Sequence, residues 1–292
     1  MKLRLSVLWC DRSGRFWPLK ALVLAAVLAP GIWLAARWSL FGLGARPLNT
    51  AIHFVGLWGL RLLLISLAVT PARGIFGLVK LVQLRRMLGL AAAAYIGAHF
   101  VLYCLDQQFQ AVHIAQEILR RHYLTIGFIT LTGLAALAAT STDAMLRRLR
   151  RNWKRLHRLV YPLAVLGLVH AFMQAKLDVS QPAILAGLFS WEMLYRALPK
   201  RLQASPWALF LLVPLAALAT AIEEAGWYGL AKHVPWQRVL EANVMVRTLG
   251  LRPAGWVGVA TLAIALLATL RHFSRRFRPP APSASAPVVV GG

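Results

Sequence analysis

The chain has 292 residues, of which 59% are hydrophobic and 14% charged, and its mean hydropathy is +0.62. This composition excludes an ordinary soluble domain and indicates an all-α polytopic membrane protein. The net charge of +24 would also suit a nucleic-acid-binding protein, but the 33 Lys and Arg lie in short blocks between apolar spans, which is typical of membrane topology. We therefore expect no nucleic-acid partner. The two cysteines, Cys10 and Cys104, are too few for a disulfide framework and belong to no zinc or iron–sulfur motif.

Eight apolar stretches are predicted to span the bilayer. Residues 1–20 form a basic lead-in with aromatic residues suited to the membrane interface, and residues 21–41 follow as the first span. A cleaved signal peptide is the alternative there, but the length of the stretch and the anchors Trp33 and Trp38 favour a helix that crosses the membrane. The other predicted spans cover about residues 53–69, 87–105, 123–139, 156–175, 182–198, 207–222 and 254–270.

The basic residues predict how these spans are oriented. With the N-terminus in the cytoplasm, 23 Lys and Arg fall on the cytoplasmic side, nine fall outside, and Arg61 lies within a span. The positive-inside rule therefore places both termini in the cytoplasm. In the outer polar stretch 223–251, we interpret the charged residues as a solvated face rather than a docking site for a partner; they are Glu223, Glu224, His233 and Glu241.

Two histidines on different spans are predicted to lie at the same depth. Arg86 and His157 mark the cytoplasmic ends of two outward-running helices, and His99 and His170 each follow thirteen residues later. At 1.5 Å per residue, both rings lie roughly 20 Å further out. Polar side chains in lipid need a partner, and two imidazoles at one level can coordinate a haem iron from opposite faces. The alternative is that each histidine only bonds a neighbouring helix.

The second span carries a histidine and an arginine on the same side of the bilayer. His53 begins the span in the outer half, where an alternative ligand, a partner for a haem propionate and a plain interfacial histidine are all open interpretations. Arg61 lies two turns deeper, so its charge should face the interior of the bundle. An anionic propionate or a quinone carbonyl would be a suitable partner there, and snorkelling towards the interface is the alternative.

His157 is the histidine for which the sequence offers no second ligand at the same depth. It lies about 20 Å inward of His170, a spacing that would suit a second haem, but thirteen residues of straight helix turn the two side chains roughly 140° apart. Pro162 could supply a kink that corrects this difference. Arg86 occupies the matching depth on the other helix, so the inner site would hold either a haem with an unidentified second ligand, a flavin or a quinone.

The motif TSTDAM at 140–145 precedes a strongly basic stretch. Ser141 or Thr142 is suited to cap the N-terminus of a short surface helix, and Asp143 is favourable in its first turn. We favour this structural role over direct flavin binding. The seven positive charges from Arg147 to Arg158 would attract anionic membrane lipid, a phosphorylated cofactor or an acidic donor protein.

Several ordered motifs resemble one family. LRRMLGL at 84–90 followed by His99, HYLTIG at 122–127, TSTDAM at 140–145, and WKRLHRLVY at 153–161 followed by His170 are similar to the MsrQ family within the ferric-reductase-like transmembrane superfamily. The resemblance implies a six-helix b-type cytochrome of the bacterial inner membrane with His99, His157 and His170 as haem ligands, and FMN as a reported cofactor type. His53 and Arg61 match the family's second-helix pattern. The implied electron donor is the quinone pool or a cytoplasmic flavin reductase, and the implied partner is a periplasmic molybdopterin-containing methionine-sulfoxide reductase that repairs oxidised proteins.

The resemblance covers about residues 20–200 and suggests three parts. Residues 1–202 would form the haem-binding transmembrane domain, residues 203–275 an extension with two further transmembrane helices, and residues 276–292 a disordered basic and Pro/Ala-rich tail. No nucleotide-binding fingerprint occurs, so this chain is not expected to oxidise NADPH by itself. The leading hypothesis is an electron-transfer subunit with one or two b-type haems. A terminal ferric or metal reductase and a non-redox transporter or assembly protein are the alternatives.

Overall fold

The described part of the chain is built from helices. A computed structural model describes residues 9–10, 14–244 and 250–276 and contains eleven α-helices, one 3-10 helix and no strand within these ranges. Most of the basic lead-in and the tail that we expect to be disordered lie outside the described residues. The prediction of an all-α polytopic membrane protein is therefore confirmed.

The helices follow most of the predicted spans in the first two thirds of the chain, but α2 begins six residues before and ends seven residues after the predicted span 53–69 and contains Pro71. They are α1 (Pro18–Phe41), α2 (Pro47–Phe76), η2 (Val79–Gln83), α3 (Leu84–Asp106), α4 (Ala111–Arg120), α5 (His122–Ala139), α6 (Asp143–His157), α7 (Val160–Gln174), α8 (Ser180–Ala197), α9 (Pro206–Lys232), α10 (Trp236–Val244) and α11 (Pro253–Arg276). The short helix α4 was not predicted. Helix α9 continues ten residues beyond the expected end of its span, residue 222.

Six helices are by themselves long and apolar enough to cross a membrane among the described residues, namely α1, α2, α3 (together with η2), α5, α9 and α11. The bent pair α6 and α7 passes the same test as one unit, which gives up to seven spans against the eight expected. Helix α8 is outside this count, and its 18 residues include the charged residues Glu192 and Arg196. Both charges are satisfied inside the bundle: the Arg196 guanidinium donates to Glu192 and, at 2.7 Å, to the Leu67 carbonyl.

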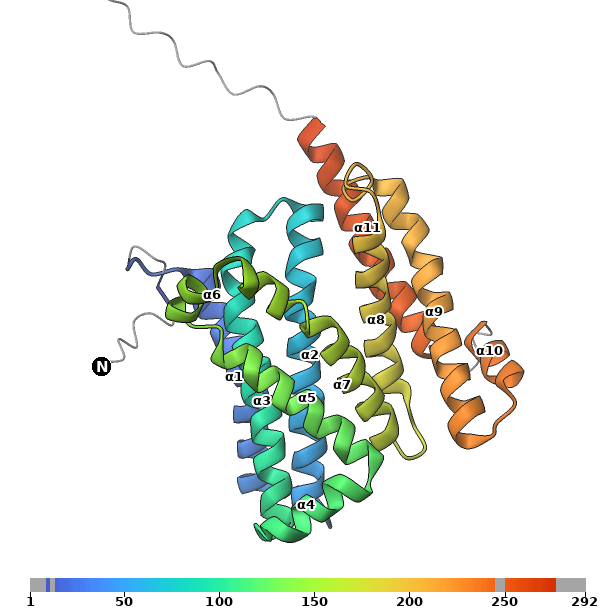
Figure 1. The fold of residues 1–292 in the computed structure, drawn as a ribbon. Coiled ribbons are helices and arrows are strands. Elements are labelled where there is room, and N and C mark those ends of the chain that lie inside the picture. Colours follow the sequence, from blue (N-terminus) through green and yellow to red (C-terminus); the bar gives the residue numbers. More distant parts are fainter. Residues whose placement is uncertain (1–8, 11–13, 245–249, 277–292) are drawn as a thin grey trace, which may run out of the picture.

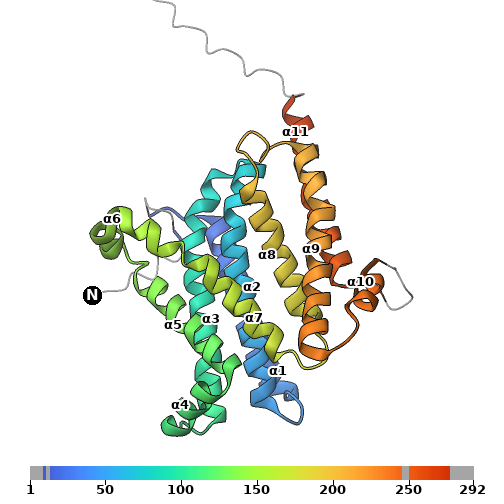
Figure 2. The same cartoon turned by 45° about the vertical axis from the view of Figure 1, so that its right-hand side comes forward.

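The helices form a bundle in which α2 lies at the centre. Figures 1 and 2 show α3 beside α2, α8 on the other side of α2, and α9 with α11 packed outside α8. The largest group of buried apolar side chains comes mainly from α2, α3, α5, α7 and α8. At one end of the bundle are the α2–α3 and α8–α9 connections, and at the other end are α4, the α7–α8 connection and α10.

A tyrosine hydroxyl is inserted into the hydrogen-bond ladder of α1. Gly31 N–H would bond the Val27 carbonyl in a regular helix, but it donates instead to the Tyr95 hydroxyl at 3.0 Å, which in turn donates to Val27 at 2.8 Å. Pro30 lies between these two positions and removes a donor from the same turn. The Tyr95 hydroxyl thus attaches α1 to α3 and gives hydrogen-bond partners to the two backbone groups that the interrupted helix leaves without one.

The basic segment forms the capped helix that was predicted. The Thr142 side chain accepts a hydrogen bond from Met145 N–H at 3.2 Å, and Asp143 lies in the first turn of α6 and pairs with Arg86 at 2.5 Å. The helix is interrupted at Arg150, whose φ is 44°, and α6 and α7 are bent by 46° at their junction. Pro162 lies in the first turn of α7, where a missing N–H costs no helical hydrogen bond.

The C-terminal helices are not an independent pair. Gly187 on α8 lies so close to Thr220 of α9 and Val257 of α11 that a Cβ there would collide with both side chains. Glu224 is 1% exposed, so the interpretation of this residue as part of a solvated face is wrong, whereas Glu241 is exposed as expected. The error arose because α9 extends further than its apolar stretch and buries its polar end against neighbouring elements.

Candidate functional site

A cavity of about 470 Å³ lies between α2, α3, α5 and α7, towards the end of the bundle that carries α4. Its volume is within the range of about 300–1,000 Å³ that is usual for ligand and cofactor sites. The deep walls are apolar and come mainly from Leu57, Leu60, Ile96, Phe128 and Leu131. Polar side chains gather towards α4 and the α7–α8 connection and are Asn49, Asp106, Gln107, Arg121, Gln174, Asp178 and Gln181.

The structure brings His99 and His170 together across this cavity. Their ring centroids are 6.2 Å apart and the ring planes are almost perpendicular, at 83°. His99 comes from α3 and His170 from α7. The two side chains lie at the same level of the bundle, as predicted. Two imidazoles on opposite faces of one iron, each with its nitrogen about 2 Å from the metal, have ring centres about 6 Å apart.

Each of these rings is oriented by a backbone carbonyl on another helix. His99 Nδ1 bonds the Ile52 carbonyl of α2 at 2.8 Å, and His170 Nδ1 bonds the Tyr123 carbonyl of α5 at the same distance. A carbonyl can only accept, so Nδ1 carries the proton and Nε2 keeps its lone pair. Neither Nε2 atom has a hydrogen-bond partner within the described part of the chain. Both rings therefore present the atom that coordinates metals.

Two glycines make room for the rings. Gly56 is four residues after Ile52, and a Cβ there would lie 2.7 Å from His99 Nδ1. Gly127 is four residues after Tyr123, and its Cβ would lie 2.7 Å from His170 Cε1. The same local arrangement thus occurs twice: a carbonyl, a glycine one turn later, and an imidazole from the neighbouring helix laid against them. Neither glycine was predicted as a site residue, although Gly127 ends the motif HYLTIG and both lie inside apolar spans without any turn to explain them.

The donor set fits a haem better than an isolated metal ion. Among the residues that the structure describes, no group of three or more His, Cys, Asp or Glu is arranged to hold a metal. Two histidines are enough for haem, because the porphyrin supplies the other four ligands of its iron. The glycine-lined approach of both rings, their unpartnered Nε2 atoms and the apolar walls all agree with that group.

His53 and Arg61 occupy different positions relative to the cavity. His53 lines it near the start of α2, together with His99 and His170. Arg61 does not line it: its guanidinium lies 5.0 Å from the centre of the Trp58 ring and donates to Gln181 at 2.7 Å. Since Gln181 is a lining residue, Arg61 reaches the cavity only through that amide.

The mouth of the cavity contains an arginine that the sequence analysis did not single out. Among the described lining residues, Arg121 is the one Lys or Arg. Its guanidinium pairs with Glu117 of α4 at 2.6 Å and donates to the Tyr123 hydroxyl at 3.1 Å. On the other side of the mouth, hydrogen bonds from Ser180 lower the pKa of the Asp178 carboxyl, so this group is ionised at neutral pH. The mouth therefore carries fixed charges of both signs.

His157 lies away from this cavity, at the end of α6. Its Nε2 is 3.2 Å from the Ser141 hydroxyl, its Nδ1 is 3.1 Å from the Trp153 carbonyl, and its ring stacks on Trp153 at 3.8 Å between centroids. Both ring nitrogens thus have protein partners. The structure does not bring His157 into contact with His99 or His170, and the bend between α6 and α7 does not turn it towards their cavity.

Comparison with known proteins identifies the relatives of this chain. Residues 55–168 match the family described as ferric reductase like transmembrane component. The heme-binding subunit MsrQ of protein-methionine-sulfoxide reductase from Xanthomonas campestris is 42% identical over 192 residues, which cover 63% of this chain and 88% of the relative. The protein of the same name from Rhodospirillum rubrum is 42% identical over 191 residues, covering 65% of this chain and 89% of the relative. No solved structure matches.

Proposed function

Because the chain belongs to the MsrQ family of heme-binding subunits, we propose that it is the membrane electron-transfer subunit of a protein-methionine-sulfoxide reductase system. In this proposal it carries electrons across the bacterial inner membrane to a periplasmic molybdopterin-containing catalytic subunit that repairs oxidised proteins. Both termini lie in the cytoplasm, as the distribution of basic residues favours. The observation that carries the proposal is the pair of imidazoles, each fixed by a carbonyl and each with a free Nε2.

His99 and His170 are the proposed axial ligands of a b-type haem. The haem supplies one-electron storage, and no side chain of this subunit carries out chemistry on methionine sulfoxide. The protein fixes the ring orientations, surrounds the group with apolar side chains and excludes water from the deep part of the cavity. Arg121 and His53 lie where they can pair with the anionic propionates, a role that the sequence had suggested for His53 and Arg61.

An optical spectrum of the purified protein tests the ligand assignment. A reduced-minus-oxidised difference spectrum should show the bands of a b-type haem, and His99→Ala and His170→Ala should each abolish the same bands, because each removes one axial ligand. Tryptophan fluorescence and thermal unfolding in detergent serve as folding controls. Absence of haem bands in the unmodified protein would exclude both redox functions and leave a non-redox transporter or assembly protein.

His157→Ala decides whether a second haem exists. The resemblance implies a third haem-ligating histidine at this position, whereas both nitrogens of His157 bond other residues. If His99 and His170 account for all of the bound haem, the variant should keep the full haem content per chain. Loss of half of the haem would assign an inner haem to His157. If the protein binds one haem per chain, FMN or quinone remains the proposed occupant of the site near the cytoplasmic side. Extraction of the purified protein followed by chromatography would identify either molecule.

A terminal metal reductase is the second candidate, because the matched family is ferric-reductase-like and the carboxylates of Asp106 and Asp178 are among the lining residues of the cavity. Deletion of this chain separates the two functions. We expect the periplasmic sulfoxide reductase to lose its electron supply while cellular ferric reduction is unchanged. The reverse result would support the metal reductase. Deletions of quinone synthesis and of the cytoplasmic flavin reductase, compared in the same assay, identify the electron donor.

A further inference from the structure

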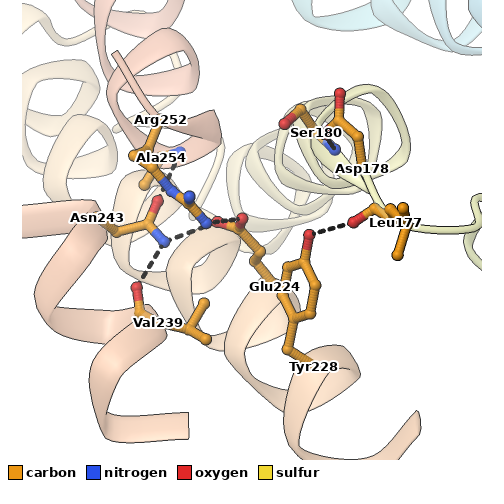
Figure 3. Close-up of polar contacts among 9 residues, drawn as sticks. All are labelled: Leu177, Asp178, Ser180, Glu224, Tyr228, Val239, Asn243, Arg252 and Ala254. Carbon is orange, nitrogen blue, oxygen red and sulfur yellow. Dashed lines mark hydrogen bonds and ion pairs between the residues drawn. The ribbon is translucent and has the colours of Figure 1, made fainter. Parts of the chain in front are cut away.

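Helix α9 contacts the segment that carries His170. The Trp227 ring packs on Phe172 with 5.3 Å between ring centroids, and Phe172 lies two residues after His170 in the last turn of α7. One residue further, the Tyr228 hydroxyl donates to the Leu177 carbonyl at 2.8 Å (Figure 3). Both side chains pack against the same group of buried residues that forms the core of the first eight helices. The end of α9 is therefore packed directly behind the segment that carries His170.

The segment held by these contacts lines the cavity. Gln174, Ala175, Asp178, Gln181 and Pro182 are all lining residues, and they run from the end of α7 into the first turn of α8. Val179, within this segment, is completely buried, and Asp178 accepts a hydrogen bond from Ser180 N–H at 2.9 Å. The connection between α7 and α8 is thus an ordered wall with one side on the cavity and the other on α9.

A polar cluster fixes the end of α9 in turn. Figure 3 shows Glu224 directed at Asn243 of α10 and at Arg252, which precedes α11. The Glu224 carboxylate is buried, pairs with Arg252 and accepts from Asn243 Nδ2 at 2.7 Å. The Asn243 side-chain oxygen accepts from Ala254 N–H at 3.3 Å in the first turn of α11. A buried carboxylate is stable only with such partners, so α9, α10 and α11 are held in one arrangement.

We infer that the C-terminal unit α9–α11 braces the last turn of α7 and the α7–α8 connection, and thereby fixes the orientation of His170 and the shape of the cavity wall. Trp227 and Tyr228 are the positioning residues, and the cluster of Glu224, Asn243 and Arg252 holds them in place. The effect on a bound haem rests on the function proposed above. The brace itself does not, because its contacts lie within the protein.

Two measurements on the full-length chain test the brace. Tyr228→Phe removes one hydroxyl and keeps the ring, and hydrogen exchange of the peptide 170–182 in the cofactor-free protein should become about fivefold faster, as expected for the loss of one hydrogen bond. In the haem-loaded protein, the electron paramagnetic resonance signature and the midpoint potential should shift, because the His170 ring changes its orientation. Trp227→Leu should produce both changes as well.

Gln203→Ala is the matched control. Gln203 donates to the Leu198 carbonyl at 3.0 Å just before the other end of α9, so its loss should leave both measurements unchanged. The inference would be overturned if Tyr228→Phe and Trp227→Leu had the same exchange rates and the same haem signature as the unmodified protein. Faster exchange with an unaltered haem signature, or equal effects of Gln203→Ala, would also overturn it. If the unmodified protein bound no haem, the proposed function would fail, and the exchange rates alone would decide whether the brace exists.

Discussion

Each of the two candidate ligands, His99 and His170, packs against a glycine that destabilises the helix in which it lies. Glycine inside a helix costs about 1 kcal/mol relative to alanine, yet Gly56 and Gly127 lie in the middle of apolar helices with helical backbone angles. Their cost is explained by the imidazole that occupies the space of the missing side chain. The carbonyl four residues earlier has two lone pairs, so it accepts both its helical N–H and the ring Nδ1–H.

Substitution of these glycines should harm the site more than the fold. In Gly56→Ala and Gly127→Ala the new Cβ would lie within 2.7 Å of a ring atom, so the ring must turn or its helix must move. We expect haem content to fall by half or more while the helical circular dichroism is retained. Gly97→Ala is the control, because no atom lies within 4 Å of the Cβ position there, and it should gain helix stability without loss of haem. Haem binding equal to wild type in both cavity variants would contradict the proposed ring positions.

The histidine pair could be predicted at the residue scale, whereas its surroundings could not. Depth follows from the distance to a basic helix end, and this simple count brought His99 and His170 together. Which way Arg61 points depends on the rotation of α2 against α8, and that rotation is set by packing that the sequence pattern does not contain. The same holds for Arg121, whose position at the cavity mouth depends on the unpredicted helix α4.

At the scale of elements, α1 depends on a residue of another helix. The ladder of α1 is opened beside Pro30 and closed again by the Tyr95 hydroxyl, which contributes one donated and one accepted hydrogen bond. Inside a bilayer no water can replace these partners. Helix α1 is therefore attached to α3 by a polar contact within an otherwise apolar interface.

Tyr95→Phe should destabilise the protein by about 1–3 kcal/mol, because a backbone donor and a backbone acceptor lose their partner. Thermal unfolding in detergent measures this loss. The cost should shrink when Pro30→Ala is also present, because a regular helix can then bond Gly31 N–H directly to Val27. Additive effects of the two substitutions would show that the hydroxyl does not replace a ladder bond.

Most long apolar helices were predicted well, whereas the short helix α4 and the polar end of α9 were not. The ends of α3, α5 and α8 agree with the predicted spans to within about three residues, since hydropathy changes sharply there. Helix α4 has only ten residues and one buried side chain, Ile114, so hydropathy gives no signal for it. The last ten residues of α9 are too polar for a predicted span, but the pairing of Glu224 makes their burial tolerable.

At the scale of the whole molecule, the cavity mouth, α4 and α10 share one end of the bundle, and the α2–α3 connection is at the other end (Figure 1). The positive-inside rule predicts that the first end faces the periplasm. Electrons would then leave the subunit on the side where its proposed catalytic partner resides. The assignment depends on charge alone, because the fold is compatible with either orientation.

Cysteine labelling tests this orientation. In a background with Cys10→Ser and Cys104→Ser, Leu177→Cys should react with a membrane-impermeant maleimide in intact spheroplasts, and Val79→Cys should react only after permeabilisation. Leu177 is 86% exposed and Val79 is 72% exposed, so access to the thiol is not limited by the protein itself. The opposite labelling pattern would invert the topology and require electrons to leave towards the cytoplasm.

The hydrogen bonds that anchor His99 and His170 to backbone carbonyls also bear on the speed of the proposed electron transfer. Each ring is hydrogen-bonded to a helix other than its own, His99 of α3 to α2 and His170 of α7 to α5, so rotation of either imidazole would break a hydrogen bond to a second helix. The deep walls of the cavity are apolar, so few dipoles close to the two rings are free to reorient when the charge inside changes by one unit. A haem held there would have a low reorganisation energy, and little driving force would be spent on rearranging the protein at each transfer.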